Sequence, residues 1–230
     1  MKFNLLKELN LALRQRQSVA IVTNLDDGDQ RLVYKADLDS DLISEPIKLM
    51  FNKRKSGSII WQDKKFFISI FEPPLRLIII GAGRIAQALV GFAGQAGYQT
   101  IVIDPRDVFA TAERFPNTQL LIEWPDIALN NLKPDKRTAV ICLSHDPKID
   151  DLTLKIALNT DSPYVGVLGS RKSHQSRVNR LISLGISEDL IKRIHAPIGI
   201  DIGAQDPVEI AISIIAEIVF VTRKKDLRSE

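Results

Sequence analysis

The chain has 230 residues, of which 45% are hydrophobic and 26% are charged, with a formal net charge of +3 and a single cysteine. This length and composition allow one large domain, or one domain with a smaller one attached, around a buried core. The small net charge and the lack of a basic stripe interleaved with aromatics argue against nucleic-acid binding. Because Cys142 is the one cysteine in the sequence, an internal disulfide and a cysteine-rich metal cluster are excluded. The apolar residues before it favour a buried, inert thiol.

The first 72 residues are expected to form a small α+β domain. Residues 1–17 carry leucines at helical spacing with charges throughout, which predicts an amphipathic helix rather than a signal peptide or membrane span, with the cytoplasm as default location. Four short apolar runs with turn residues between them follow and predict hairpin strands, at 18–24, 31–36, 56–62 and 65–71. Pro73 and Pro74 then break any regular element, so we place the domain boundary between 1–72 and 73–230.

From Leu75 onward, apolar strands alternate with helices. The predicted strands are 75–80, 99–104, 118–124, 138–144 and 164–169. The predicted helices are 84–96, 108–115, 147–158, 171–184, 187–193 and 207–222. Unbroken apolar strands in this alternation indicate a parallel sheet covered on both faces. The fold class is therefore α/β, a doubly wound Rossmann-type domain.

The segment "GAGRIA", residues 81–86, matches the G-x-G-x-x-G/A pattern with alanine in the third place. An apolar strand precedes it and an amphipathic helix follows, which is the context that the dinucleotide-binding pattern requires. The residues predicted to hold a diphosphate at this turn and helix start are Gly81, Ala82, Gly83, Arg84 and Ile85. The alternative is a Rossmann-type turn that binds nothing measurable, since a fold does not by itself imply a function.

Asp104 ends the second strand, where a carboxylate can accept hydrogen bonds from the ribose hydroxyls of an adenosine. This position favours NAD. Arg106, two residues further on, can instead accommodate a 2′-phosphate, so the choice between NAD and NADP stays open.

Polar residues follow the fourth and fifth strands, where open α/β sheets place their ligand contacts. His145 can carry a proton or orient a ligand, whereas Asp146 before Pro147 is also explained as a helix cap. Ser170 is a plausible cap. Arg171, His174, Arg177 and Arg180 recur along one helix face and suit either an anionic ligand or a solvated surface.

The segment "HAPIGIDIGAQDP", residues 195–207, leads into the last helix. Asp206, Pro207 and Glu209 occupy the N-cap, first and third helical positions, which predicts a helix start. Glycines flank Asp201, so we expect it to face a cleft. The three histidines lack metal-binding spacing, and no metal site is expected.

The motifs "FEPPLRLIIIGAGRIAQAL", "VIDPR", "AVICLSHDPKIDD", "YVGVLGSRKSH" and "IHAPIGIDIGAQDPVEIAISIIAEIV" carry a resemblance to a known family. Together they span about residues 71–219, and the last two are the specific ones. The segment resembles the XdhC/CoxI family of accessory factors for the maturation of xanthine dehydrogenase and related molybdenum hydroxylases.

The resemblance implies a protein that binds the molybdenum cofactor, protects it during sulfuration by a cysteine desulfurase, and delivers it to a molybdenum hydroxylase. It implies that Gly81, Gly83 and Asp104 line a nucleotide site for NAD(P), and that a cleft beside it is lined by His145, Ser170, Arg171, His174 and Asp201. A homodimer is a possible assembly. The chain departs from the family pattern in two places: a Gly-Gly-Cys-Val-Glu motif is absent before residue 71, and Arg84 replaces a histidine.

Two other functions stay open from the sequence. An NAD(P)-dependent oxidoreductase would use the same turn, with His145 as a proton donor. A nucleotide-sensing module would bind without catalysis.

Overall fold

The computed structural model describes residues 2–227, and side chains as far as Arg223. The chain divides into two compact units, one made of the residues up to Pro73 together with those from Asp226 onward, and the other running from Pro74 to Lys225. Each unit has hydrophobic clusters of its own, and each is described by itself.

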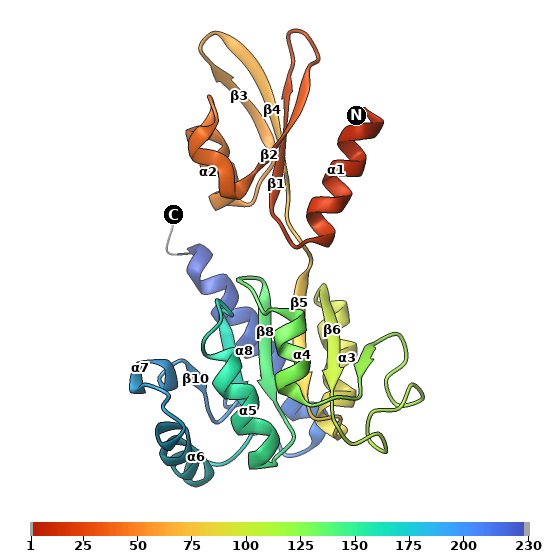
Figure 1. Cartoon of the computed structure of the whole chain (residues 1–230), viewed down its shortest axis with the longest axis vertical. Coiled ribbons are helices and arrows are strands. Elements are labelled where there is room, and N and C mark those ends of the chain that lie inside the picture. The colour runs from red at the N-terminus through yellow and green to blue at the C-terminus, as the bar shows by residue number, and fades with distance from the viewer. Residues whose placement is uncertain (1, 228–230) are drawn as a thin grey trace. The chain divides into compact units, whose positions relative to one another are not determined.

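The first unit is a four-stranded antiparallel sheet in the order β2-β1-β4-β3 (Figure 1). Its elements are α1 (Phe3–Arg14), β1 (Val19–Asn24), β2 (Gln30–Tyr34), the 3₁₀ helix η1 (Lys35–Ser40), α2 (Ser44–Lys53), β3 (Gly57–Trp61) and β4 (Lys64–Phe71). Leu9 and Ala12 of α1 are buried with one face of β1, and Ile47 and Phe51 of α2 with the other. The strands and α1 confirm the prediction, whereas α2 was not predicted.

The second unit contains a six-stranded parallel sheet in the order β10-β9-β8-β5-β6-β7 (Figure 1). Its strands are β5 (Leu75–Ile80), β6 (Tyr98–Ile103), β7 (Gln119–Leu121), β8 (Thr138–Cys142), β9 (Tyr164–Val167) and β10 (Ile194–His195). In chain order this is the Rossmann arrangement, which confirms the predicted fold class. The strand order reverses between β5 and β8, and ligands of such sheets bind outside the carboxyl ends of the strands at this point.

Helices cover both faces of this sheet (Figure 1). They are α3 (Arg84–Gln95), α4 (Pro125–Leu132), α5 (Pro147–Ala157), α6 (Arg171–Ser183), α7 (Glu188–Ile191) and α8 (Pro207–Leu227). Alternate residues along β5 point to opposite faces, as the pleat of a strand requires. Leu77 and Ile79 join a cluster with α3 and α8, while Ile78 and Ile80 join one with α4, α5 and α6.

Three elements of this unit differ from the prediction. The helix predicted over residues 108–115 is wrong, because these residues form turns in which only Ala110 and Phe115 are buried. Arg114 donates from Nη1 to the carbonyl of Phe109 and so stabilises the turns. Helix α4 and strand β10 were not predicted. The two residues of β10 are too few to show a hydrophobic period.

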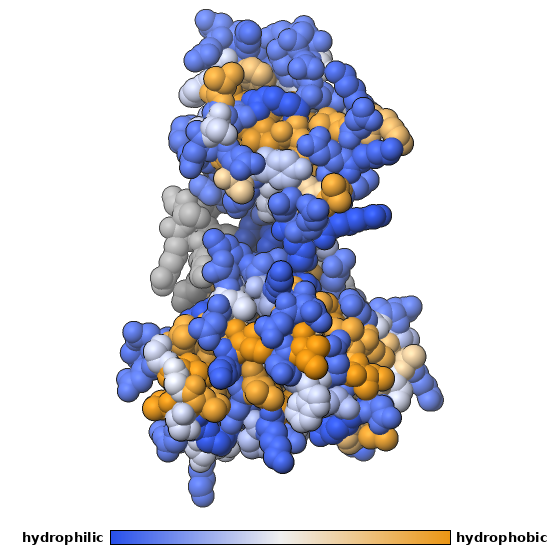
Figure 2. Space-filling view, in the orientation of Figure 1, coloured by the Kyte–Doolittle hydropathy of each residue, from blue (hydrophilic) through white to orange (hydrophobic). Residues whose placement is uncertain are grey.

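Apolar residues interrupt the hydrophilic surface of both units, as Figure 2 shows. Within residues 2–227, no helix has the length and apolar character needed to cross a membrane.

Candidate functional site at the carboxyl edge of the parallel sheet

Gly81 begins the turn between β5 and α3, and the fold itself requires glycine there. Its φ is +101°, and a Cβ at this position would lie 2.6 Å from the backbone nitrogen of Ser144 and 2.7 Å from its Cα. The amide of Gly81 donates to the carbonyl of Ile103 on β6 at 2.8 Å. The turn is therefore held between β6 and the segment that follows β8, at the point where the strand order reverses.

Gly83 differs from Gly81, because nothing within the described chain accounts for a glycine at this position. Its φ of −79° is open to any residue, and a Cβ there would have no atom within 4 Å. Gly83 is the N-cap of α3 but offers no side-chain cap, and within residues 2–227 no acceptor meets the amides of Gly83, Arg84 and Ile85. Free amides at a helix start, with space in front of them, fit the diphosphate of a dinucleotide.

The side chains of this helix start divide between core and surface. Ala82 and Ala86 are fully buried, Ile85 is half-buried and packs against the core, and Arg84 is exposed. Ile85 can therefore contribute its backbone amide to a ligand, while Arg84 can contribute both its amide and its charge.

Asp104, directly after β6, is fully buried and bonded within the chain. Its Oδ2 accepts from the amide of Ala82 at 2.8 Å and from Arg106 Nη2 at 2.9 Å. Its Oδ1 accepts from the amide and from Nε of Arg106, at 3.0 and 2.8 Å. Burial opposes ionisation, but the hydrogen bonds from Arg106 and Ala82 outweigh it and hold the pKa of Asp104 below its ordinary value.

Through the hydrogen bond from the Ala82 amide, Asp104 links the Gly81 turn to the end of β6. Both of its oxygens are engaged, so the ribose contact predicted for Asp104 requires Arg106 to move aside. The Arg106 side chain is 39% exposed, and its guanidinium lies over the ring of Phe109, with the guanidinium carbon 4.7 Å from the ring centroid. Arg106 therefore presents a charged, planar group beside the turn.

The segment after β8 reaches the same edge. Ser144 donates from Oγ to Asp150 Oδ1 at 2.7 Å, and burial raises the pKa of Asp150. Asp146 caps α5 by accepting from the amide of Lys148 at 2.9 Å, which confirms its capping role. His145 is exposed and has a φ of +61°, a left-handed conformation that is uncommon for residues other than glycine. Its side chain is open to a ligand or to solvent.

Helix α6 begins at the carboxyl end of β9. Ser170 caps it by accepting from the amide of Ser173 at 3.2 Å, as predicted. Ser170 and Arg171 are exposed, whereas His174, one turn further along, is half-buried. The helix face predicted to carry Arg171 and His174 is therefore exposed at its start and partly buried one turn later.

The segment between β10 and α8 contains Asp201, which is exposed and accepts from the amide of Gly203 at 3.4 Å. Among the described residues, no hydrogen bond or ion pair joins Asp201 to His145, His174 or the Gly81 turn. Asp206 accepts from the amides of Val208 and Glu209 at 2.8 and 2.9 Å, so the predicted helix start is confirmed.

A polar cluster beneath this segment was not predicted. Glu217 of α8 accepts from the Tyr164 hydroxyl at 2.6 Å and from the Gly199 amide at 2.6 Å, and its Oε1 lies 2.9 Å from His195 Nδ1. The rings of Tyr164 and His195 stack with centroids 4.4 Å apart. Burial opposes ionisation of Glu217, but its donors outweigh it and lower its pKa. The cluster fixes the start of the 199–206 segment to α8.

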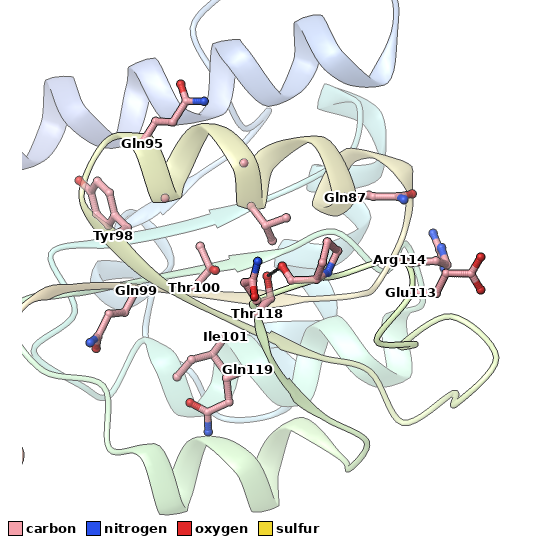
Figure 3. Close-up of a pocket in the computed structure, with 15 residues that line it drawn as sticks. Gln87, Gln95, Tyr98, Gln99, Thr100, Ile101, Glu113, Arg114, Thr118 and Gln119 are labelled. Carbon is pink, nitrogen blue, oxygen red and sulfur yellow. Dashed lines mark hydrogen bonds between the residues drawn. The ribbon is translucent and has the colours of Figure 1, made fainter.

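A groove of about 990 Å³ lies along α3 and β6, outside the predicted site. Figure 3 shows Gln87 and Gln95 on α3, with Glu113 and Arg114 toward the Gln87 end. Apart from those two charged residues its lining is mostly amides, small residues and hydroxyls, and none of the predicted site residues lines it. The groove and the Gly81 turn are therefore separate features.

Metal-binding chemistry finds no support in the described residues. Within the part of the chain that the structure describes, no three of its histidines, cysteines, aspartates and glutamates gather to hold a metal ion. Cys142 is fully buried, and burial raises the pKa of its thiol well above the ordinary value. Cys142 is therefore buried, as predicted, and we expect its thiol to be unreactive in the folded chain.

Strand order, the glycine turn and the open helix start define a Rossmann-type domain. The XdhC Rossmann domain model matches residues 77–218, and the chain belongs to the XdhC family. The match covers the turn, the segments after β8 and β9, and most of α8.

Two relatives share about a third of the residues over this region. The chain is 32% identical over 165 residues to a probable xanthine dehydrogenase subunit of Bacillus subtilis (strain 168), covering 71% of this chain and 48% of that protein. It is 32% identical over 151 residues to the molybdenum cofactor insertion chaperone PaoD of Escherichia coli (strain K12), covering 66% of this chain and 41% of PaoD. The chain thus spans less than half the length of these relatives.

A solved structure is similar over nearly the whole chain. It is the crystal structure of a xanthine dehydrogenase from Bacillus halodurans, with a TM-score of 0.68 and 28% sequence identity. The similarity covers 96% of this chain and 64% of the other. It therefore extends over both units.

Proposed function

We propose that this protein is an accessory factor for a molybdenum hydroxylase of the xanthine dehydrogenase type, and that it binds a nucleotide or the molybdenum cofactor at the carboxyl edge of its parallel sheet. The observation that carries the proposal is the match of residues 77–218 to the XdhC Rossmann domain. The name of the E. coli relative, a molybdenum cofactor insertion chaperone, supports cofactor handling.

In this proposal the diphosphate of the ligand binds at the amides of Gly83, Arg84 and Ile85. The space in front of Gly83 supports this, because no atom of the described chain would meet a Cβ there. NAD and NADP both contain a diphosphate, so either can bind at these amides. The molybdenum cofactor is proposed from the names of the relatives.

Arg106 then lies beside the bound nucleotide, where its planar group can stack on a ring or meet a phosphate. His145, Ser170, Arg171, His174 and Asp201 are proposed to line the neighbouring cleft. Of these, His145, Ser170, Arg171 and Asp201 are exposed and can reach a ligand without a change in the core.

The proposed partners are the molybdenum hydroxylase that receives the cofactor and a cysteine desulfurase that supplies sulfur. We also propose a cytoplasmic location and a homodimer. The names of the relatives, which concern xanthine dehydrogenase and molybdenum cofactor insertion, support the first partner.

The test combines ligand identification with reconstitution. The full chain is purified natively and its bound small molecules are identified by mass spectrometry. It is then added to an apo-hydroxylase together with molybdenum cofactor, and recovery of hydroxylase activity is followed. We expect a retained pterin or dinucleotide and a faster or fuller recovery than without the protein. Failure to retain either ligand, together with unchanged recovery, would overturn the proposal.

The matched control is Gly83→Ser. Serine at an N-cap hydrogen-bonds to the free amides of its own helix and fills the space in front of them. This variant should fold normally, lose retained ligand and no longer assist reconstitution. If the protein retains NAD(P) but has no effect on the hydroxylase, it is a nucleotide-binding module and the proposed accessory function is wrong.

A further inference from the structure

Arg177, on the second turn of α6, is a buried cation without a full set of partners. The residue is only 6% exposed. Nη2 donates to the carbonyl of Leu168 at 3.1 Å, whereas Nε and Nη1 are buried and meet no acceptor among the described residues. Buried charged donors without acceptors are strongly unfavourable and call for a physical explanation.

His174 adds another unpartnered atom on the same face of the helix. Its Nδ1 is buried and has no hydrogen-bond partner within residues 2–227. Residues three apart on a helix are neighbours, about 5–6 Å apart at their Cβ atoms. Burial, together with the charge of Arg177, lowers the pKa of His174, which places the imidazole and the guanidinium in one electrostatic environment. The orphaned atoms therefore form one cluster.

The carboxylates near this cluster do not complete it. Asp150 is 1% exposed and accepts from Ser144, and burial raises its pKa toward the neutral acid despite the charge of Arg177. Asp151 accepts two hydrogen bonds from Arg180, at 2.6 Å from Nε and at 3.1 Å from Nη2. Arg177 is thus left with a charge that its neighbours compensate incompletely.

The cluster lies at the carboxyl end of β9. Gly169 has a φ of +142°, and a Cβ there would lie 2.6 Å from Ser173 Oγ and 3.5 Å from Arg177 Nη2. The guanidinium therefore reaches back along α6 to the turn that follows the strand. Since β9 is two strands from β5, and neighbouring strands are about 4.8 Å apart, the carboxyl ends of these two strands are about 10 Å apart across the sheet.

We infer that Arg177 and His174 form a second anion subsite, which binds a phosphate group separately from the diphosphate turn at Gly81. Arg177 supplies its unpartnered Nε and Nη1 groups and the charge, and His174 supplies Nδ1. Because these atoms are closed off from solvent, binding requires the exposed segment 170–173 or the Arg177 side chain to shift. Because both sites follow carboxyl ends of strands in the same parallel sheet, one phosphorylated ligand can engage both.

The subsite is tested with inorganic phosphate on the full chain, followed by NMR of the histidine rings. The chain has three histidines, and His174→Gln assigns the His174 signals. We expect saturable shifts of the His174 ring at millimolar phosphate and a rise in the pKa of His174, because a bound anion favours the imidazolium. Sulfate should compete, since the two anions share tetrahedral geometry. The absence of saturable His174 shifts would overturn the inference.

Arg177→Gln removes the central cation and should weaken phosphate binding by about 10- to 100-fold, the range for hydrogen bonds to a charged group. The matched control is Lys155→Gln, which removes an equal charge from an exposed position of the neighbouring helix α5 and should change affinity by less than about twofold. Equal losses in both variants would indicate a surface charge effect and would overturn the subsite. Should Arg177→Gln fail to fold, Arg177→Lys keeps the charge and should bind measurably more weakly.

Gly83→Ser separates this inference from the proposed function. It should weaken dinucleotide binding by about tenfold or more and leave the phosphate response of His174 unchanged. If dinucleotide binding is absent from the wild-type protein but His174 responds, the proposed function fails and the subsite stands. If His174 responds only when Gly83 is intact, phosphate is binding at the Gly81 turn and the subsite is overturned.

Discussion

The two glycines of the turn provide a matched pair of substitutions with opposite expected effects. Gly81→Ala forces a Cβ to within 2.6–2.9 Å of the backbone of Ser144 and Leu143, at a φ of +101°. A residue with a side chain in a left-handed conformation costs about 1–2 kcal/mol, and overpacking adds about 1–3 kcal/mol. We expect Gly81→Ala to reduce the free energy of unfolding of the second unit by about 2–5 kcal/mol, much of the typical total.

Gly83→Ser places its side chain in open space at an ordinary φ. Serine is a slightly better N-cap than glycine, so we expect the free energy of unfolding to stay constant or rise by about 0.3 kcal/mol. Dinucleotide affinity should fall by about tenfold or more, because the serine hydroxyl takes the amides that the diphosphate needs. Stability and ligand binding are thus assigned to different glycines.

The assay is urea unfolding followed by tryptophan fluorescence. The chain has two tryptophans, Trp61 in the first unit and Trp124 in the second, so a Trp61→Phe background reports on the second unit alone. Nucleotide titration of the same variants measures affinity. The reasoning would be refuted by a Gly81→Ala variant as stable as the parent, or by a Gly83→Ser variant that binds dinucleotide as the parent does.

Three further outcomes follow from buried groups. Glu217→Gln weakens the contacts to Tyr164, His195 and Gly199. It should lower the free energy of unfolding by about 1–3 kcal/mol, measured by urea unfolding at neutral pH. Unchanged stability would contradict the role of the cluster. The pKa of Asp104 is lower in the folded chain than its ordinary value of 3.8. Its contribution to stability is therefore present above pH 3.8 and is lost as the pH falls through the folded pKa. As the pH is lowered in the acidic range, the urea midpoint should fall more steeply in the parent than in Asp104→Asn. Cys142 should resist a thiol reagent in the native state and react once per chain in urea, and rapid native labelling would show that its burial is wrong.

The fold of the second unit could be predicted because its strands are continuous apolar runs. Buried on both faces, β5 and β8 cannot be confused with surface segments. The residues at 108–115 misled the prediction because their spacing suits a helix, yet the chain there forms turns with local side-chain contacts. Arg106 lies over Phe109, and Arg114 donates to the Phe109 carbonyl. These contacts stabilise the turns in place of a regular helix.

The site was less predictable than the fold, because its geometry depends on pairs distant in sequence. The Gly81 turn and the caps Asp146, Ser170 and Asp206 follow from local patterns, and all three caps are confirmed. The engagement of Asp104 depends on the amide of Ala82, 22 residues earlier. A carboxylate after the second strand looks the same in sequence whether it faces a ribose or its own chain.

The helix starts at the carboxyl edge give the strongest reason to place a ligand at α3. Helices α5, α6 and α8 begin with side chains that accept hydrogen bonds from their first amides, and these helices need no external anion. Helix α4 also has no side-chain cap, but its first residue is Pro125, which has no amide hydrogen to satisfy. Helix α3 begins at Gly83 with no such acceptor, although a serine there would fit and would stabilise the chain. The missing cap at Gly83, at the point where the strand order reverses, supports the proposal that a ligand supplies the negative charge there.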